Sequence, residues 1–214
     1  MPLSASPTPH PAAALPLYLA SASPRRSELL TQIGLDHTVL RVPSPPGEDE
    51  PRLPDESVRA YAQRTTLDKT QRAVAWVEQQ GLPRGLILCA DTSVALGEEL
   101  LGKPVDAADA ARILRSLSGQ RHEVRTWVAL YDPLNARTLE RESVSLVWMK
   151  PLSATEIQAY CASGEAQGKA GAYGIQGLAS IFIERLDGSY SGVMGLPLHE
   201  TAELLRAAGR PVLG

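Results

Sequence analysis

Residues Leu17–Gly34 read LYLASASPRRSELLTQIG and join a short strand to a helix. The apolar run Leu17–Ala20 predicts the strand. Ser23 is a residue type that caps helix N-termini, Pro24 suits the first helical position, and Gly34 suits the end of a helix. A strand that runs directly into a helix is typical of α/β proteins.

The same alternation continues to the end of the chain. Further helices are predicted over residues 56–78, 106–119, 153 onward and 197–208, and strands over 86–90, 122–131, 142–150 and 181–186, with a hairpin over 94–101. Residues 42–54 are rich in Pro and acidic residues and predict a loop. The expected fold class is α/β, with a mixed twisted sheet and flanking helices. Residues 1–16 are expected to be a disordered, Pro- and Ala-rich tail, and residues 17–214 a single domain.

The composition limits the kind of protein that this chain forms. With 214 residues, 43% of them hydrophobic, it can bury one substantial core or two small coupled lobes. Its net charge of −3 provides no basic field for duplex nucleic acid, and no apolar run reaches membrane-spanning length. Cys89 and Cys161 lack metal-ligand spacing, so we expect no structural zinc and a reducing, cytoplasmic location.

Residues Lys169–Gly177 read KAGAYGIQG and predict a shaped loop. Glycine is used where the backbone takes a positive φ or approaches another group closely, and so many glycines disfavour a helix or strand. Lys169 brings a cation to one end, and Gln176 brings an amide that both donates and accepts hydrogen bonds. The alternative is a glycine-rich turn without a binding role.

Two arginines, Arg25 and Arg26, fall in the first turn of the first predicted helix. The helix dipole disfavours cations there, so the pair either faces water or meets an anion. Free N–H groups and two guanidinium groups at a helix N-terminus favour phosphate binding. The alternative is a solvated basic turn.

Asp91 and Thr92 follow directly after the predicted buried strand 86–90. In α/β sheets ligand sites gather at the carboxyl ends of strands, where a carboxylate can hold a metal ion or activate water. The alternative for Asp91 is a cap for the next turn. Lys103 either reaches a phosphate or is an ordinary surface charge, and His122 is expected to be a packed, hydrogen-bonded histidine.

Together these segments resemble the Maf family of nucleoside triphosphate pyrophosphatases, also called septum-formation-inhibitor-like proteins. The matching segments cover nearly the whole chain after the tail: LYLASASPRRSELL from Leu17, CADTSVAL from Cys89, LGKP from Leu101, LSG from Leu117 and KAGAYGIQG from Lys169, followed by GSY and GLPL. The resemblance implies an elongated α/β fold, related to inosine triphosphate pyrophosphatases, with a deep cleft between two lobes. It also implies hydrolysis between the α- and β-phosphates of a nucleotide, with a divalent metal cation (Mg²⁺, Mn²⁺ or Co²⁺).

The resemblance also implies a role for each matching residue. Asp91 matches the proton acceptor and is a candidate metal ligand. The positions tied to substrate choice are Arg25, Thr92 and Gln176. The positions placed to contact the substrate phosphates are Ser21, Arg26, Lys69, Lys103 and Lys169. The implied partner is a small-molecule nucleoside triphosphate, with no nucleic acid and no membrane, and a homodimer is a family-level expectation.

One segment departs from the family pattern. The family usually has a short acidic loop near residues 42–55 that supplies a carboxylate to the metal ion or the water. Here the loop is longer and proline-rich, so Glu48, Asp49 and Glu50 all remain candidates. Glu50 is favoured as a metal ligand by its distance to the following helix.

The glycine loop places the chain with relatives that hydrolyse dTTP and UTP, with modified pyrimidine nucleotides as further candidates, rather than with those that act on 7-methyl-GTP. The chemistry of Gln176 agrees, because its amide can donate to a pyrimidine carbonyl and accept from the imide N–H. The alternative function is a non-catalytic, nucleotide-sensing regulator of cell division. The water-activating carboxylate expected at Asp91 argues against that alternative.

Overall fold

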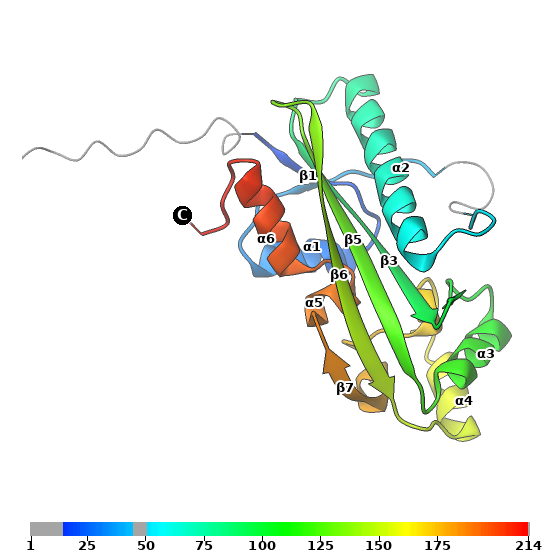
Figure 1. The fold of residues 1–214 in the computed structure, drawn as a ribbon. Coiled ribbons are helices and arrows are strands. Elements are labelled where there is room, and N and C mark those ends of the chain that lie inside the picture. The colour runs from blue at the N-terminus through cyan, green and yellow to red at the C-terminus, as the bar shows by residue number, and fades with distance from the viewer. Residues whose placement is uncertain (1–14, 45–50, 214) are drawn as a thin grey trace, which may run out of the picture.

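The computed structural model describes residues 15–44 and 51–213, and in these residues it contains one seven-stranded mixed sheet. The strand order is β2-β1-β3-β5-β6-β7, with β4 paired to β3 (Figure 1). The strands are β1 Leu17–Leu19, β2 Thr38–Val39, β3 Leu86–Leu96, β4 Glu99–Leu100, β5 Arg121–Asp132, β6 Arg137–Met149 and β7 Ile183–Asp187. The helices are α1 Pro24–Gln32, α2 Val58–Gln79, α3 Ala107–Leu117, α4 Ala154–Ala162, α5 Tyr190–Met194 and α6 Leu198–Ala207, with short 3-10 helices η2 Ala170–Ala172 and η3 Leu178–Phe182.

The sheet is mixed, as the sequence predicts. β1 pairs in parallel with both β2 and β3, and the remaining neighbours pair antiparallel. β3, β5 and β6 are long enough to run through both halves of the molecule (Figure 1). These three strands therefore join the two halves into one body.

In one half of the molecule, helices cover both faces of the sheet. α1 and α6 pack Leu30 and Leu204 against Leu88 on one face. On the other face, Ala73 of α2 packs against Ile87 of β3. Because successive strand residues point to opposite faces, the continuous apolar run in β3 serves both sides. Figure 1 shows α2 on one side of these strands and α1 and α6 on the other.

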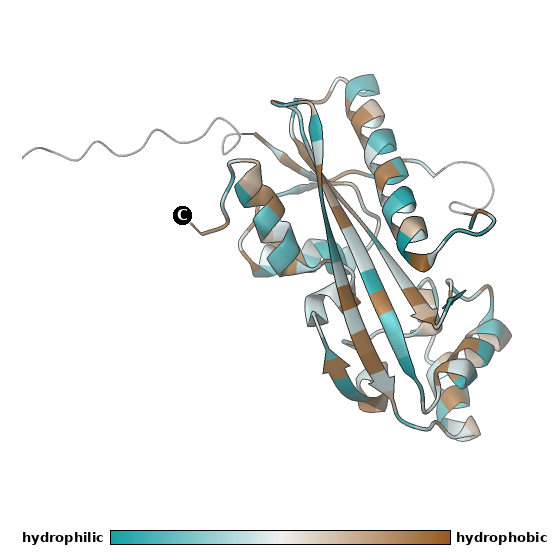
Figure 2. Ribbon diagram, in the orientation of Figure 1, coloured by the Kyte–Doolittle hydropathy of each residue, from teal (hydrophilic) through white to brown (hydrophobic). Residues whose placement is uncertain are grey.

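The other half has a separate apolar core. α3 and α4 contribute Ile113, Leu114 and Ile157, which pack with Val147 of β6 and Phe182 of η3. Apolar residues gather toward the end of β6 in Figure 2, whereas β7 is mixed. The two lobes that the resemblance implies thus correspond to distinct apolar clusters along shared strands.

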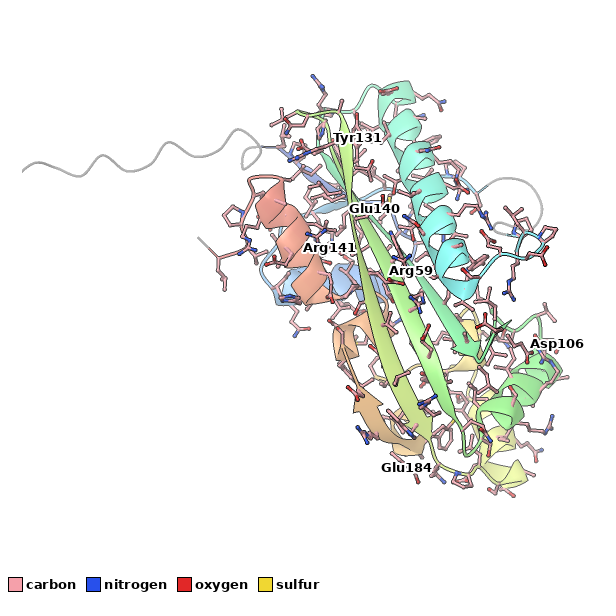
Figure 3. All side chains as sticks on the ribbon, viewed as in Figure 1. Arg59, Asp106, Tyr131, Glu140, Arg141 and Glu184 are labelled. Carbon is pink, nitrogen blue, oxygen red and sulfur yellow. The ribbon has the colours of Figure 1, made fainter. Side chains whose placement is uncertain are left out.

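The long helix α2 also docks through polar groups. The Arg59 guanidinium lies 5.3 Å from the centre of the Trp127 ring, and Arg59 Nε donates to Glu142 at 3.1 Å. Glu140 accepts from Gln63 Nε2 at 3.1 Å and from Trp127 Nε1 at 2.9 Å. Figure 3 labels Arg59 and Glu140, which lie where α2 faces the strands. These contacts fix the helix that carries part of the candidate site.

Most of the predicted elements are confirmed, although the Ser23 side chain makes no capping hydrogen bond to α1. Pro24 begins α1, and the Asp106 side chain accepts from Asp109 N at the start of α3 at 2.7 Å. Ser153 and Glu156 form a capping box at α4. No helix in the described ranges is both long and apolar enough to cross a membrane.

Several details differ from the sequence prediction. β2 was not predicted, and β6 begins at Arg137 rather than at residue 142. Asp91 is not at a strand end, because β3 pairs with β5 from Ile87 to Ala95 and continues to Leu96, which pairs with β4. The last strand begins at Ile183 rather than at residue 181, because the preceding residues form η3. The short helix α5, which the Ser189 side chain caps, was not predicted.

Candidate active site

One large cavity gathers most of the residues singled out by the sequence. It has a volume of about 1100 Å³ and is lined from both lobes. The predicted site residues that line it are Ser21, Arg25, Arg26, Lys69, Asp91, Thr92, Lys103 and Lys169. They come from the β1–α1 connection, α1, α2, β3 and the segments after β4 and α4, several of which are distant in sequence.

The cavity forms where β1 stops and β3 continues. β1 covers only residues 86–88 of β3, which leaves one edge of the following residues uncovered by β1. Neighbouring strand residues point to opposite faces, so Asp91 faces α2 and Thr92 faces α1. Both residues line the cavity because it wraps around this edge of β3.

The Asp91 carboxylate is held by two side chains of α2. Lys69 Nζ donates to Oδ1 at 2.6 Å, and Thr65 Oγ1 donates to Oδ2 at 3.0 Å. Thr65 is fully buried, and Asp91 is only 9% exposed. A carboxylate with an ammonium on one oxygen and a hydroxyl on the other is fixed in orientation, which suits it to hold a water or a ligand in place.

The Arg26 guanidinium lies at the centre of a second group. It donates through Nε to the carbonyl of Gly195 at 2.7 Å, through Nη1 to Ser21 Oγ at 3.1 Å, and through Nη2 to Thr92 Oγ1 at 3.3 Å. Arg25 Nε donates to the carbonyl of Met194 at 3.3 Å. The end of α5 thus fixes both arginines beside the first turn of α1.

Gly195 allows the Arg26 side chain to lie close to the backbone at the end of α5. Its φ is +119°, a conformation that side-chain-bearing residues rarely adopt, and an added Cβ would lie 3.4 Å from Arg26 Nε and 3.6 Å from Thr92 Oγ1. The bend after α5 can therefore present its carbonyl to Arg26 without crowding the site.

Thr92 is held by a buried partner on the next strand. The Thr126 hydroxyl lies 2.9 Å from Thr92 Oγ1 and donates to the carbonyl of Gly192 at 2.8 Å. Thr126 is 1% exposed and does not line the cavity. A line of hydrogen bonds therefore runs from Arg26 through two threonines to α5.

Two lysines approach from the other lobe. Lys103 is exposed and lines the cavity after β4, and Lys169 is half-buried at the start of the glycine loop. Burial and the neighbouring Arg25 lower the pKa of Lys169, while Glu165 opposes the change. Lys169 Nζ donates to the backbone carbonyl of Glu165. Arg25, Lys103 and Lys169 thus bring cations from both lobes to the same cavity.

Gln176 is not brought into this cavity. It is exposed, and it is not among the residues that line the cavity. Its assignment to the nucleobase stays a prediction. Glu48, Asp49 and Glu50 lie outside the described residues, so the choice among them also stays a prediction.

Glu165 fixes the turn that carries Gln176. Its carboxylate accepts from Tyr160 Oη at 2.9 Å and from the backbone N–H of Leu178 at 2.8 Å. Tyr160 Oη in turn accepts from the backbone N–H of Gly174 at 3.1 Å. A Cβ on Gly177 would overlap the Glu165 carboxylate, so the glycine leaves room for this contact.

His122 is a core residue, as expected. It is 2% exposed, and its Nε2 lies 2.8 Å from Tyr173 Oη. Burial lowers the pKa of His122 to about 4. The ring is therefore neutral near neutral pH, and it supports Tyr173, whose ring belongs to the cavity lining.

Comparison with known proteins agrees with this architecture. A family model described as Maf-like protein matches residues 16–208. The chain belongs to the Maf family. The match extends through both lobes and includes every described residue of the cavity.

Curated relatives are similar over nearly their whole length. A dTTP/UTP pyrophosphatase of Bordetella avium is 59% identical over 193 residues, which is 90% of this chain and 95% of the relative. A protein of the same name from Polaromonas sp. is 50% identical over 90% of this chain and 96% of its own length. One from Aromatoleum aromaticum is 48% identical over 92% of this chain and 97% of its own length.

Sequence reasoning missed several residues of this Maf-family site. Thr65 lies four residues before Lys69, so both face the same side of α2, and that spacing was an available signal. Thr126 and Val124 are two residues apart and lie on the same buried face of β5. The pairing of Thr126 with Thr92, however, depends on strand register. Glu165 had no signal in the sequence, because its partners belong to a loop whose path only the fold determines.

Proposed function

We propose that this Maf-family protein hydrolyses dTTP and UTP, giving the nucleoside monophosphate and pyrophosphate. The observation that carries the proposal is the charge of the cavity around Asp91. The cationic residues that line it are Arg25, Arg26, Arg41, Lys69, Arg72, Lys103 and Lys169, whereas its carboxylates, within the described ranges, are Glu28 and Asp91. Such an excess of positive charge suits the triphosphate chain of a nucleotide.

The cavity suits a divalent cation that is held jointly by the protein and the substrate phosphates. No group of three or more His, Cys, Asp or Glu in the described part of the chain could hold a metal ion by itself. Mg²⁺, however, is commonly held by one or two carboxylates together with substrate phosphates and water. Asp91 would supply the carboxylate, with Glu50 as the predicted second ligand. When bound, the cation would neutralise charge on the phosphate oxygens.

In the proposed reaction, Asp91 acts on a water molecule beside the α-phosphate. Asp91 accepts one proton from the water as the water oxygen forms a bond to the α-phosphorus. The bond from the α-phosphorus to the bridging oxygen breaks, and pyrophosphate leaves with its electron pair. Lys69 and Thr65 keep the carboxylate oriented throughout, and the arginines and lysines stabilise the phosphate charge.

The pyrimidine preference rests on the relatives and on the glycine loop. The relatives are named for dTTP and UTP, and Gln176 carries an amide that complements a thymine or uracil edge. A cytoplasmic location and a homodimer accompany this proposal as predictions.

The test is to incubate the purified protein and divalent cation with each common nucleoside triphosphate and with 7-methyl-GTP. Pyrophosphate release from dTTP and UTP in preference to the others supports the proposal. Orthophosphate as the first product would identify a phosphatase instead, and binding without any release would favour a nucleotide sensor.

The variant Asp91→Asn gives the sharper form of this test. It keeps the shape of the side chain but removes the proton acceptor, so kcat should fall by about 10²–10⁴-fold. Nucleotide binding, measured by calorimetry, should persist because the cations remain. Near-normal turnover by this variant would show that another group activates the water.

A further inference from the structure

The two hydroxyl groups that accept from Arg26 have opposite hydrogen-bonding roles. Ser21 Oγ accepts from Arg26 Nη1 at 3.1 Å and from the backbone N–H of Ser23 at 3.2 Å. A hydroxyl has two acceptor positions and one proton. Both acceptor positions of Ser21 are therefore used, and what it has left for a bound molecule is its proton.

Thr92 has the reverse arrangement. Thr126 uses its single proton on the carbonyl of Gly192, at 2.8 Å, because a carbonyl can only accept. In the 2.9 Å contact between the two threonines, Thr92 must then be the donor. Thr92 also accepts from Arg26 Nη2 at 3.3 Å. Its proton is committed, and one acceptor position remains.

We infer that Thr126 makes Thr92 an acceptor toward the bound nucleotide, and that Thr126 is therefore a specificity-determining residue that acts without touching the substrate. The inference rests on the proposed function. Phosphate oxygens only accept, so Thr92 does not bind them, whereas the Ser21 proton suits them. Thr92 instead selects a substrate N–H or O–H.

Two groups of dTTP have this chemistry. The imide N–H of thymine or uracil is a donor that cytosine lacks at the same ring position, and the 3′-hydroxyl of the sugar is the other donor. Both meet the same requirement, and substrate analogues separate them. dCTP lacks the imide N–H, and 2′,3′-dideoxy-TTP lacks the 3′-hydroxyl.

Thr126→Val and Thr126→Ser form the matched pair of variants. Valine keeps the shape of threonine and removes the hydroxyl, so the Thr92 proton is released and can turn toward the substrate. Serine keeps the hydroxyl, and with it the hydrogen bonds to Thr92 and to the carbonyl of Gly192. The carbonyl of Gly192 keeps a partner in either variant, because it also accepts from the Gly195 N–H at 3.0 Å.

The experiment measures kcat/KM for dTTP, dCTP and 2′,3′-dideoxy-TTP with wild type and both variants. In Thr126→Val, the preference for dTTP over one of the two analogues should fall about tenfold, the scale on which one buried hydrogen bond discriminates. Thr126→Ser should keep the wild-type ratios. An equal loss for all three substrates would mean that Thr126 only supports the fold, and would overturn the inference.

Dissociation constants for the three nucleotides are also measured without divalent cation, and their ratios are compared in the same way. This binding measurement needs no turnover. Absent turnover with a shifted binding ratio would reject the proposed function but support the role of Thr126. Normal turnover with unshifted ratios would reject the role of Thr126 alone. A protein that binds none of the three nucleotides would overturn both.

Discussion

The contacts around Asp91 determine what this carboxylate can do. Lys69 and Thr65 hold its two oxygens from the same face of α2, and Thr65 is fully buried. Because Thr65 touches no part of the large cavity, it acts through Asp91 as a positioning residue.

Thr65→Val removes this hydroxyl while keeping the side-chain shape. A hydrogen bond to a charged group contributes about 1.5–3 kcal/mol, so kcat should fall by roughly 10- to 150-fold with little change in KM. Thr65→Ser should restore kcat, which is measured by steady-state kinetics at saturating dTTP. A raised KM with unchanged kcat would place Thr65 in substrate binding instead.

At the residue level, the sequence identified many of the residues that line the cavity, but it did not identify the contacts that hold them in place. Arg25, Arg26 and Asp91 were found from residue type and position, and they line the same cavity. Thr126 could not be found in this way, because its role follows from its register opposite Thr92. The position of Gln176 likewise depends on how Glu165 folds the loop.

At the level of elements, the length of β3 was the main error. The apolar run stops before Asp91, and a polar residue after such a run resembles a strand end. The strand continues because each residue through Ala95 pairs with β5. Pairing with a distant strand leaves no local signal, whereas the capping box of Ser153 and Glu156 can be read from residues close together in the sequence.

The loop after α4 depends on the fit between Gly177 and Glu165. Gly177→Ala would place a methyl group against the Glu165 carboxylate, and overpacking of this kind costs about 1–3 kcal/mol. We expect a lower free energy of unfolding in urea. The matched control is Gly102→Ala, where an added Cβ meets nothing within 4 Å, and it should change stability little.

The double variant Gly177→Ala/Glu165→Ala tests the cause. With the carboxylate gone, the added methyl group no longer meets an obstacle, so the two costs should be clearly less than additive. Strict additivity would mean that Gly177 is needed for another reason.

For the whole molecule, the arrangement of two apolar clusters on shared strands creates the cavity between them. The α/β class and the mixed sheet were predictable from alternating elements, whereas the cleft between two lobes was expected only from the family resemblance. It depends on β1 being three residues long while β3 has eleven. That difference in length leaves room for a ligand beside Asp91.

The buried His122 makes the free energy of unfolding depend on pH. Its pKa is about 4 in the folded protein and about 6.5 in an unfolded chain. Between these values the unfolded chain binds more protons, so the free energy of unfolding decreases as the pH falls through this window. The loss attributable to His122 should reach about 3 kcal/mol near pH 4.

His122→Gln should remove this part of the pH dependence. Glutamine can still hydrogen-bond to Tyr173 but does not titrate. Urea unfolding of both proteins near neutral pH and near pH 4 gives the comparison, and other titrating groups cancel because both proteins share them. Equal loss of stability in the two proteins would show that His122 is not the group responsible.

In the proposed reaction, the cavity around Asp91 directs water to the α-phosphorus of a pyrimidine triphosphate. The most direct test is hydrolysis of dTTP in water labelled with heavy oxygen, followed by mass spectrometry of both products. The label should appear in the monophosphate, and Asp91→Asn should slow its incorporation about 10²–10⁴-fold. Label found in pyrophosphate, which would mean attack at the β-phosphorus, would contradict the proposed reaction.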